Sequence, residues 1–118
     1  MELTTRTVGD GSGNEMVLIP YTDEGVTVPA GFIFDGCSTP RVFWWLIPPY
    51  KGTKKAAVVH DYICKQAKTY EERRKGDLLF RKLLKKYSGF PDWMIAAGYY
   101  AVSAFSIYKV LIGELDYE

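Results

Sequence analysis

The sequence is poor in the residues that often reveal a function. Among 118 residues it has one histidine and two cysteines, and its formal net charge is only +1. Two cysteines are too few for a disulfide scaffold, and nothing in the spacing of Cys37 and Cys64 requires a bridge. A charge so close to zero exerts no global attraction on nucleic acid. The chain also lacks internal repeats and low-complexity tracts, so residues 1–118 are expected to form a single domain.

Signals for export or membrane insertion are missing as well. The start of the chain, MELTTRTVGDGSG, has neither a basic nor an apolar segment of the kind found in signal peptides. The longest uncharged run, residues 93–108, has sixteen residues and includes several tyrosines and serines. A membrane-spanning helix needs about 20 apolar residues. We therefore expect an intracellular protein without a transmembrane helix, while contact with a membrane surface or a protein partner stays open.

Residues 1–34 have the pattern of short strands. Apolar or threonine-rich segments of three to seven residues alternate with segments rich in glycine, asparagine and aspartate. This pattern predicts a small antiparallel sheet of three or four strands. The expected strands are Glu2–Val8, Met16–Tyr21, Val26–Pro29 and Phe32–Phe34, with turns at residues 9–14 and 22–25.

Residues 35–52 are expected to form a polar loop and a short aromatic helix. Thr39 is a good N-cap and Pro40 suits the first helical position. Trp44 and Trp45 would cover the core, each with an indole N–H near the surface. The preceding loop, DGCSTPR, has two interpretations. It is either an anion-binding turn that uses Asp35, Ser38 and Arg41, or an Asx-type turn with a helix cap.

Residues 53–112 predict three main helices, which makes the fold class α+β. The first covers Lys54–Ala67 with Thr53 as its cap, and the second runs from Tyr70 to about Tyr87. TYEE at residues 69–72 is a capping box, and Ser88-Gly89 supplies a stop. The last helix, Asp92–Leu111, is apolar and is expected to be central. The second helix is basic, which is typical of a solvated face. Its basic residues are Arg73, Arg74, Lys75, Arg81, Lys82, Lys85 and Lys86.

The only histidine, His60, interrupts the apolar stretch AAVVHDYICKQA at residues 56–67. Buried polar groups need partners, so a histidine beside the apolar face of a helix needs an explanation. Asp77 lies in line with the apolar stripe of the next helix, and the short turn between the helices makes them antiparallel neighbours. The spacing therefore predicts a His60–Asp77 pair. The pair either ties two helices together or orients His60 as a general base.

Asp61 and the cysteines suggest two kinds of metal site. Asp61 lies about 100° further round the helix than His60. It could ligate a hard cation such as calcium together with carbonyls of the 35–39 loop. Zinc is a second interpretation, with His60 and Cys64 as ligands and Cys37, Asp61 or Asp77 completing the set. The chain contains neither CxxC nor HExxH, which argues against zinc.

The segments VPAGFIFDGCSTPRVFWWLI, KKAAVVHDYIC and RRKGDLLF follow one another between residues 28 and 80. This order resembles a family of small phage and prophage proteins that is classed as a domain of unknown function. The resemblance covers about residues 26–84. It implies phage origin, and the family carries no established activity.

The order of the His-Asp helix and a second helix with an aspartate is also similar to secretory and viral phospholipases. This resemblance implies that His60 is the general base, Asp61 the calcium ligand and Asp77 the residue that orients His60. The sequence departs from that pattern in two ways. Cys64 stands where the phospholipase helix has tyrosine, and no glycine-rich calcium loop precedes the helix.

Two functional hypotheses follow. The first is a phage-encoded accessory or virion-associated protein, located in the host cytoplasm or the virion, that binds a phage or host protein partner. Its surface candidates are Trp44, Trp45, Tyr99 and Tyr100. The second is a metal-assisted esterase or phospholipase-like hydrolase with catalytic His60 and Asp77 and with Asp61 as metal ligand.

Overall fold

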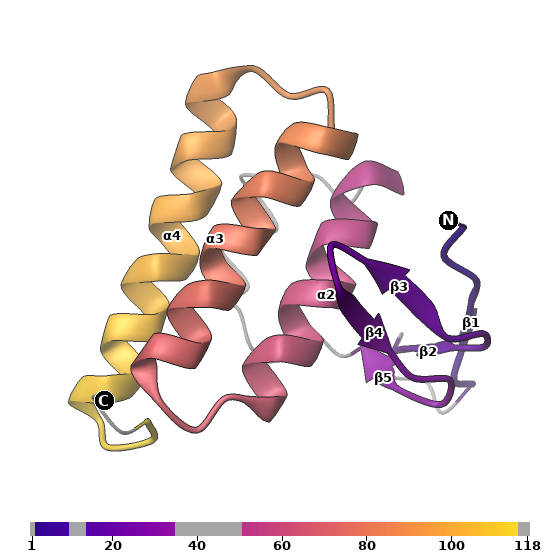
Figure 1. The fold of residues 1–118 in the computed structure, drawn as a ribbon, viewed down its shortest axis with the longest axis horizontal. Coiled ribbons are helices and arrows are strands. Elements are labelled where there is room, and N and C mark those ends of the chain that lie inside the picture. Colours follow the sequence, from indigo (N-terminus) through magenta and orange to yellow (C-terminus); the bar gives the residue numbers. More distant parts are fainter. Residues whose placement is uncertain (1, 10–13, 35–50, 116–118) are drawn as a thin grey trace.

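The computed structural model describes residues 2–9, 14–34 and 51–115. These residues form a β-rich N-terminal region followed by three long helices (Figure 1), which confirms the predicted α+β class. The loop and short helix predicted for residues 35–50 lie outside the described residues. The same holds for the candidate residues Asp35, Ser38, Arg41, Trp44 and Trp45.

The described strands form two small antiparallel sheets, whereas the sequence predicted one. A three-stranded sheet has the order β1-β2-β5, and β3 pairs with β4 in a hairpin. The segment predicted as one strand, Met16–Tyr21, breaks after Val17, because Pro20 lacks a backbone donor. Glu24 and Gly25 both have positive φ, and they close the hairpin. The strands are β1 (Thr5–Thr7), β2 (Glu15–Val17), β3 (Tyr21–Asp23), β4 (Val26–Val28) and β5 (Ile33–Phe34).

The three helices are α2 (Lys51–Gln66), α3 (Tyr70–Tyr87) and α4 (Asp92–Leu111). The capping box is confirmed, since the Thr69 hydroxyl accepts a hydrogen bond from the Glu72 amide at 3.2 Å. The prediction that Thr53 caps its helix is wrong. The helix begins at Lys51, so Thr53 lies inside it, where its buried hydroxyl has no hydrogen-bond partner among the described residues.

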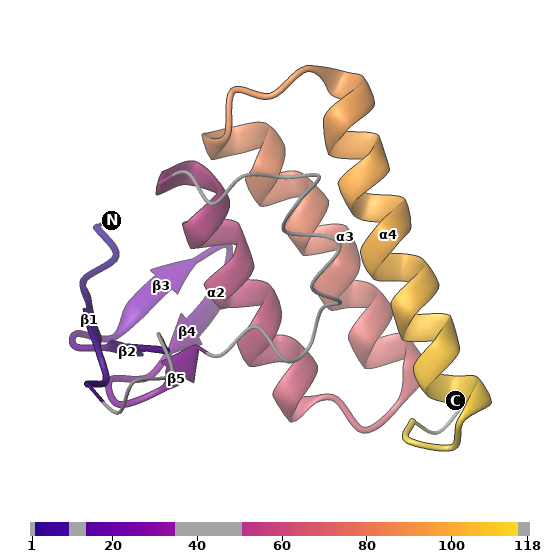
Figure 2. The same cartoon turned by 180° about the vertical axis from the view of Figure 1, so that it is seen from behind.

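The helices form a layer with α3 in the middle, between α2 and α4, and the strands lie beside α2 (Figures 1 and 2). The prediction that the last helix is central is therefore wrong. The buried residues of α4 are Ile95, Gly98, Val102 and Ser106, which form one stripe that faces α3. By length and composition alone, α4 is long and apolar enough to cross a membrane. The stripe that faces α3 is buried inside the protein, and little of the rest of the helix is buried.

The core joins the strands to the helix layer. Each large apolar side chain in it contributes about 1.5–3 kcal/mol to stability on burial. Its largest fully buried apolar members are Val17, Tyr21, Val28, Val58, Val59, Phe80, Leu83, Leu84 and Val102.

A polar cluster fastens the β3–β4 hairpin to the C-terminal end of α3. The Asp23 carboxylate accepts hydrogen bonds from the hydroxyls of Tyr21 and Tyr87 and from Lys86 Nζ. Burial raises the pKa of Asp23, but the three donors outweigh this effect and hold it below its usual range. Burial and the bond to Asp23 raise the pKa of Tyr21 well above its ordinary value.

Candidate functional site

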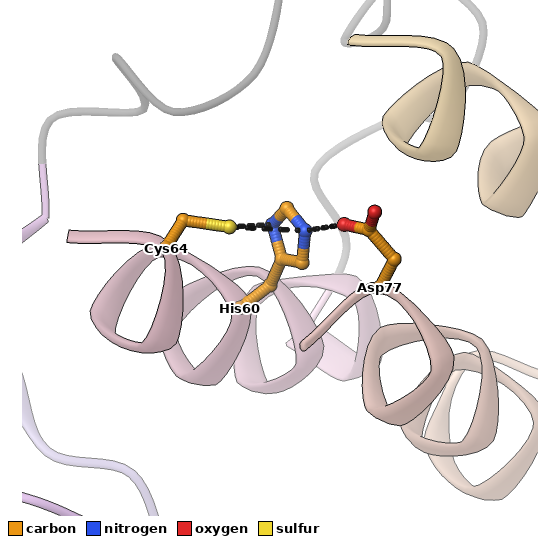
Figure 3. Close-up of side chains that lie close together, drawn as sticks. All are labelled: His60, Cys64 and Asp77. Carbon is orange, nitrogen blue, oxygen red and sulfur yellow. Dashed lines mark hydrogen bonds and ion pairs between the residues drawn. The ribbon is translucent and has the colours of Figure 1, made fainter. Parts of the chain in front are cut away.

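The structure brings His60 and Asp77 together, as the sequence pattern predicts. His60 Nε2 lies 2.7 Å from Asp77 Oδ1, and the two side chains point toward each other from α2 and α3 (Figure 3). Both residues are almost fully buried, with 2% exposure for His60. The pair therefore links two helices inside the protein, and its catalytic role stays a prediction.

Gly76 explains how α2 and α3 come close enough for this bond. A Cβ atom on Gly76 would lie 2.7 Å from Ile63 Cγ2, which is closer than real side chains approach. The glycine therefore gives Ile63 of α2 room against the backbone of α3. Asp77 follows directly in the chain, so the close approach places its carboxylate within hydrogen-bonding distance of His60.

Two further residues complete the network, and the sequence analysis did not identify either. Ser106 Oγ donates a hydrogen bond to Asp77 Oδ2 at 2.6 Å and accepts one from Arg73 Nε at 2.8 Å. Asp77 thus connects α2 and α4 through one carboxylate. Arg73 was predicted on a solvated basic face, yet it is buried. Its position four residues before Asp77, on the same face of α3, was the sequence feature that could have indicated this burial.

Cys64 lies next to the histidine ring. Its Sγ is 3.4 Å from His60 Nε2 and 3.9 Å from Nδ1 (Figure 3), and its thiol is free. The potential ligand atoms of His60, Cys64 and Asp77 all lie within 4.8 Å of one another. Two ligands of a tetrahedral zinc ion are separated by about 3.3–3.5 Å. The distance from Cys64 Sγ to His60 Nε2 has this value. The distance from His60 Nε2 to Asp77 Oδ1, 2.7 Å, is instead the length of a hydrogen bond and is shorter than the separation of two zinc ligands.

The charge state of His60 follows from its neighbours. Burial of the ring lowers the pKa of His60, but the interaction with Cys64 and the hydrogen bond to Asp77 outweigh it and raise this pKa to about 9. The imidazole is therefore protonated at neutral pH, and both nitrogens then act as donors. A base in this position becomes effective only at alkaline pH or when a nearby positive charge lowers the pKa.

Asp61, the neighbour of His60 in the chain, is buried as well. Neither of its carboxylate oxygens has a hydrogen-bond partner among the described residues, and Lys65 Nζ lies 3.4 Å from Oδ2 as an ion pair. A buried carboxylate usually accepts several hydrogen bonds or binds a cation, so these oxygens suit a hard cation. The carbonyls of the 35–39 loop, predicted as its other ligands, lie outside the described residues.

A cavity of about 220 Å³ opens beside Cys64, at the C-terminal ends of α2 and α4. Its lining mixes polar and apolar groups and carries more basic than acidic side chains. It gives the Cys64 side of the network a potential route to solvent. The lining residues are Cys64, Lys65, Ala67, Arg73, Lys109, Glu114 and Leu115.

The predicted aromatic surface residues that the structure describes are Tyr99 and Tyr100, both on α4. Their ring centroids are 5.4 Å apart, and Tyr100 is 68% exposed while Tyr99 is half-buried. Tyr100 lies on the exposed face of α4, whereas the Tyr99 ring lies against the Arg81 guanidinium of α3, and no hydrogen bond among the described residues joins either tyrosine to the His60 network.

The fold and the buried network define a small α+β domain with a strand region at one side of a three-helix layer. The model of the family described as "Protein of unknown function (DUF1353)" matches residues 15–102, which is most of the chain, so the protein belongs to this family. No curated protein and no solved structure matches the chain.

Proposed function

We propose that this protein works by binding a partner through the outward face of α4. The observation that carries the proposal is the exposure of large apolar side chains there, with Trp93 at 69%, Tyr100 at 68% and Leu111 at 79%. Contiguous apolar patches on a folded protein mark sites of interaction. The burial of His60 also favours binding over catalysis, because a general base must reach its substrate.

The biological setting is part of the same proposal. The resemblance of the motif order in residues 26–84 to small phage and prophage proteins is the ground for proposing a phage-encoded accessory or virion-associated protein. Its partner would be a phage or host protein, with action in the host cytoplasm or the virion. A lipid surface is the competing ligand for the same apolar face.

A photo-crosslinking amino acid placed at Tyr100 tests the binding role. The matched control carries the same group at Lys75, an exposed position on α3. We expect discrete crosslinked products from position 100 in cells that express the protein, with the attached peptide identified by mass spectrometry. Equal crosslinking from both positions, or none from position 100, would contradict the proposal.

A second candidate function is metal-assisted ester hydrolysis, and the observation that favours it is the Asp61 carboxylate. A calcium ion on Asp61 would polarise the carbonyl or phosphoryl oxygen of the substrate. His60 would accept a proton from the attacking water, while Asp77 holds the ring. A positive charge near His60 would lower its pKa from about 9, so cation binding and base strength would be coupled.

A calcium titration monitored by the melting temperature tests this candidate. Calcium that binds only the native state must raise the melting temperature, and Asp61→Asn should abolish that rise. Asp77→Asn is the comparison, since it alters the histidine pair but leaves Asp61 in place. An unchanged melting temperature in the native protein, with no hydrolysis of ester or phospholipid substrates, would exclude the hydrolase.

A further inference from the structure

The exposed residues of α4 follow a coiled-coil repeat. Successive members of the stripe are separated alternately by four and three residues, and each one is apolar and exposed. A spacing of this kind forms a seam along one side of a helix, and such seams pack against a second helix. The residues of this seam are Trp93, Ala97, Tyr100, Ala104, Ile107 and Leu111.

The seam lies on the side of α4 opposite its contact with α3. The residues that face α3 are centred on Val102, and at 100° per residue the seam is rotated from them by about 140–180°. Charged groups are absent from this part of the helix, because residues 93–108 are all uncharged. The fold therefore leaves an entire apolar helix face without a covering element among the described residues.

We infer that the occupant of this face is a second copy of the chain, with the two α4 helices packed antiparallel about a two-fold axis beside residue 102. The inference rests on the proposed binding role of α4 and names its partner. A two-fold interface must be self-complementary, because each contact occurs twice. The residues of the seam meet this requirement.

Side-chain size gives the self-complementarity. In the antiparallel register, Tyr100 of one copy faces Ala104 of the other, and Ala97 faces Ile107. Each small residue is thus opposite a large one, so the two faces fill the space between the helices evenly. A parallel pair would put tyrosine against tyrosine and alanine against alanine. It would be crowded at one level and hollow at the next.

The direction and the area of the contact agree with this arrangement. Antiparallel helices place the positive end of each dipole beside the negative end of the other. The large residues of this face, Trp93, Tyr100, Ile107 and Leu111, are 46–79% exposed, and Tyr108 and Ile112 at its border are about half exposed. A stable interface buries about 800 Å² of each partner, and these side chains supply its apolar centre.

Sedimentation velocity over micromolar to submillimolar concentrations tests the dimer, and a swap of two residues tests the register. Tyr100→Ala leaves a hole opposite Ala104, and Ala104→Tyr creates a clash opposite Tyr100. Each single variant should weaken dimerisation roughly tenfold or more. The double variant Tyr100→Ala/Ala104→Tyr restores a large residue opposite a small one and should recover most of the affinity.

Leu78→Ala is the matched control, because Leu78 is an exposed apolar residue on α3 and should not affect the dimer. Circular dichroism of each variant verifies that it is folded. A native protein that stays monomeric at every concentration overturns the inference, and so does a dimer that is indifferent to the changes at 100 and 104. A monomer that binds phosphatidylcholine vesicles through Tyr100, or crosslinks from position 100 to another protein, overturns the dimer while leaving the proposed binding role intact.

Discussion

The Ser106 hydroxyl lies 2.6 Å from Asp77 Oδ2, while His60 Nε2 lies 2.7 Å from Oδ1 of the same carboxylate. One aspartate in the middle helix therefore holds both neighbouring helices. Removing the charge should disturb the whole helix layer, because a buried network loses its common acceptor and leaves donors without partners.

Asp77→Ala is expected to lower the free energy of unfolding by roughly 3–5 kcal/mol, the cost of breaking a buried charged pair. Ser106→Ala should cost less, about 1–3 kcal/mol, since the Asp77–His60 bond remains. Urea denaturation measures both values. Glu71→Ala is the control, because Glu71 is an exposed carboxylate on the same helix. A loss at Asp77 no larger than at Glu71 would contradict the role of the network.

Stability should depend on pH through His60. Its pKa in the folded protein, about 9, is above the ordinary value of 6.5. The contribution of protonated His60 to the free energy of unfolding is therefore complete below about pH 6.5. It is lost as the pH rises through 9, and the free energy of unfolding then falls by roughly 1–3 kcal/mol in total. Denaturation at pH 6.5 and pH 9.5 measures the change, and His60→Asn should remove most of it. Stability of the native protein that rises over this interval would refute the assignment.

Gly76→Ala should destabilise the protein, although alanine is the better helix former. The gain in helix propensity is about 1 kcal/mol, whereas overpacking against Ile63 costs typically 1–3 kcal/mol. The double variant Ile63→Ala/Gly76→Ala should show favourable coupling, because the smaller side chain relieves the clash. The two single variants and the double variant, measured by thermal denaturation, give this coupling. Additive effects would mean that the two residues do not touch.

Asp23→Asn should loosen the β3–β4 hairpin and cost roughly 1–3 kcal/mol at neutral pH. The pKa of Asp23 is depressed in the folded protein, so its contribution is present above the ordinary value of 3.8 and is lost as the pH falls below it. The difference between the native protein and Asp23→Asn should therefore shrink in acid. Glu24→Gln is the control, because Glu24 contacts Lys86 from a more exposed position. A difference that persists unchanged at pH 2 would contradict this account.

The sequence alone determined the features that depend on neighbouring residues. The capping box at Thr69–Glu72, the stop at Ser88-Gly89 and the bounds of α4 are local patterns, and all are present in the structure. The His60–Asp77 pair was also predictable, because a short turn forces consecutive helices to lie side by side. The two apolar stripes then decide which residues meet.

Only the tertiary structure decided what depends on segments far apart in the chain. The second partner of Asp77 comes from α4, and no local pattern distinguishes Ser106 from Ser103, the other serine of that helix. The apolar composition of α4 predicted a central helix, yet composition cannot state which elements cover it. One face packs on α3 and the other is exposed, because the compact layer gives α4 a single neighbouring helix among the described residues.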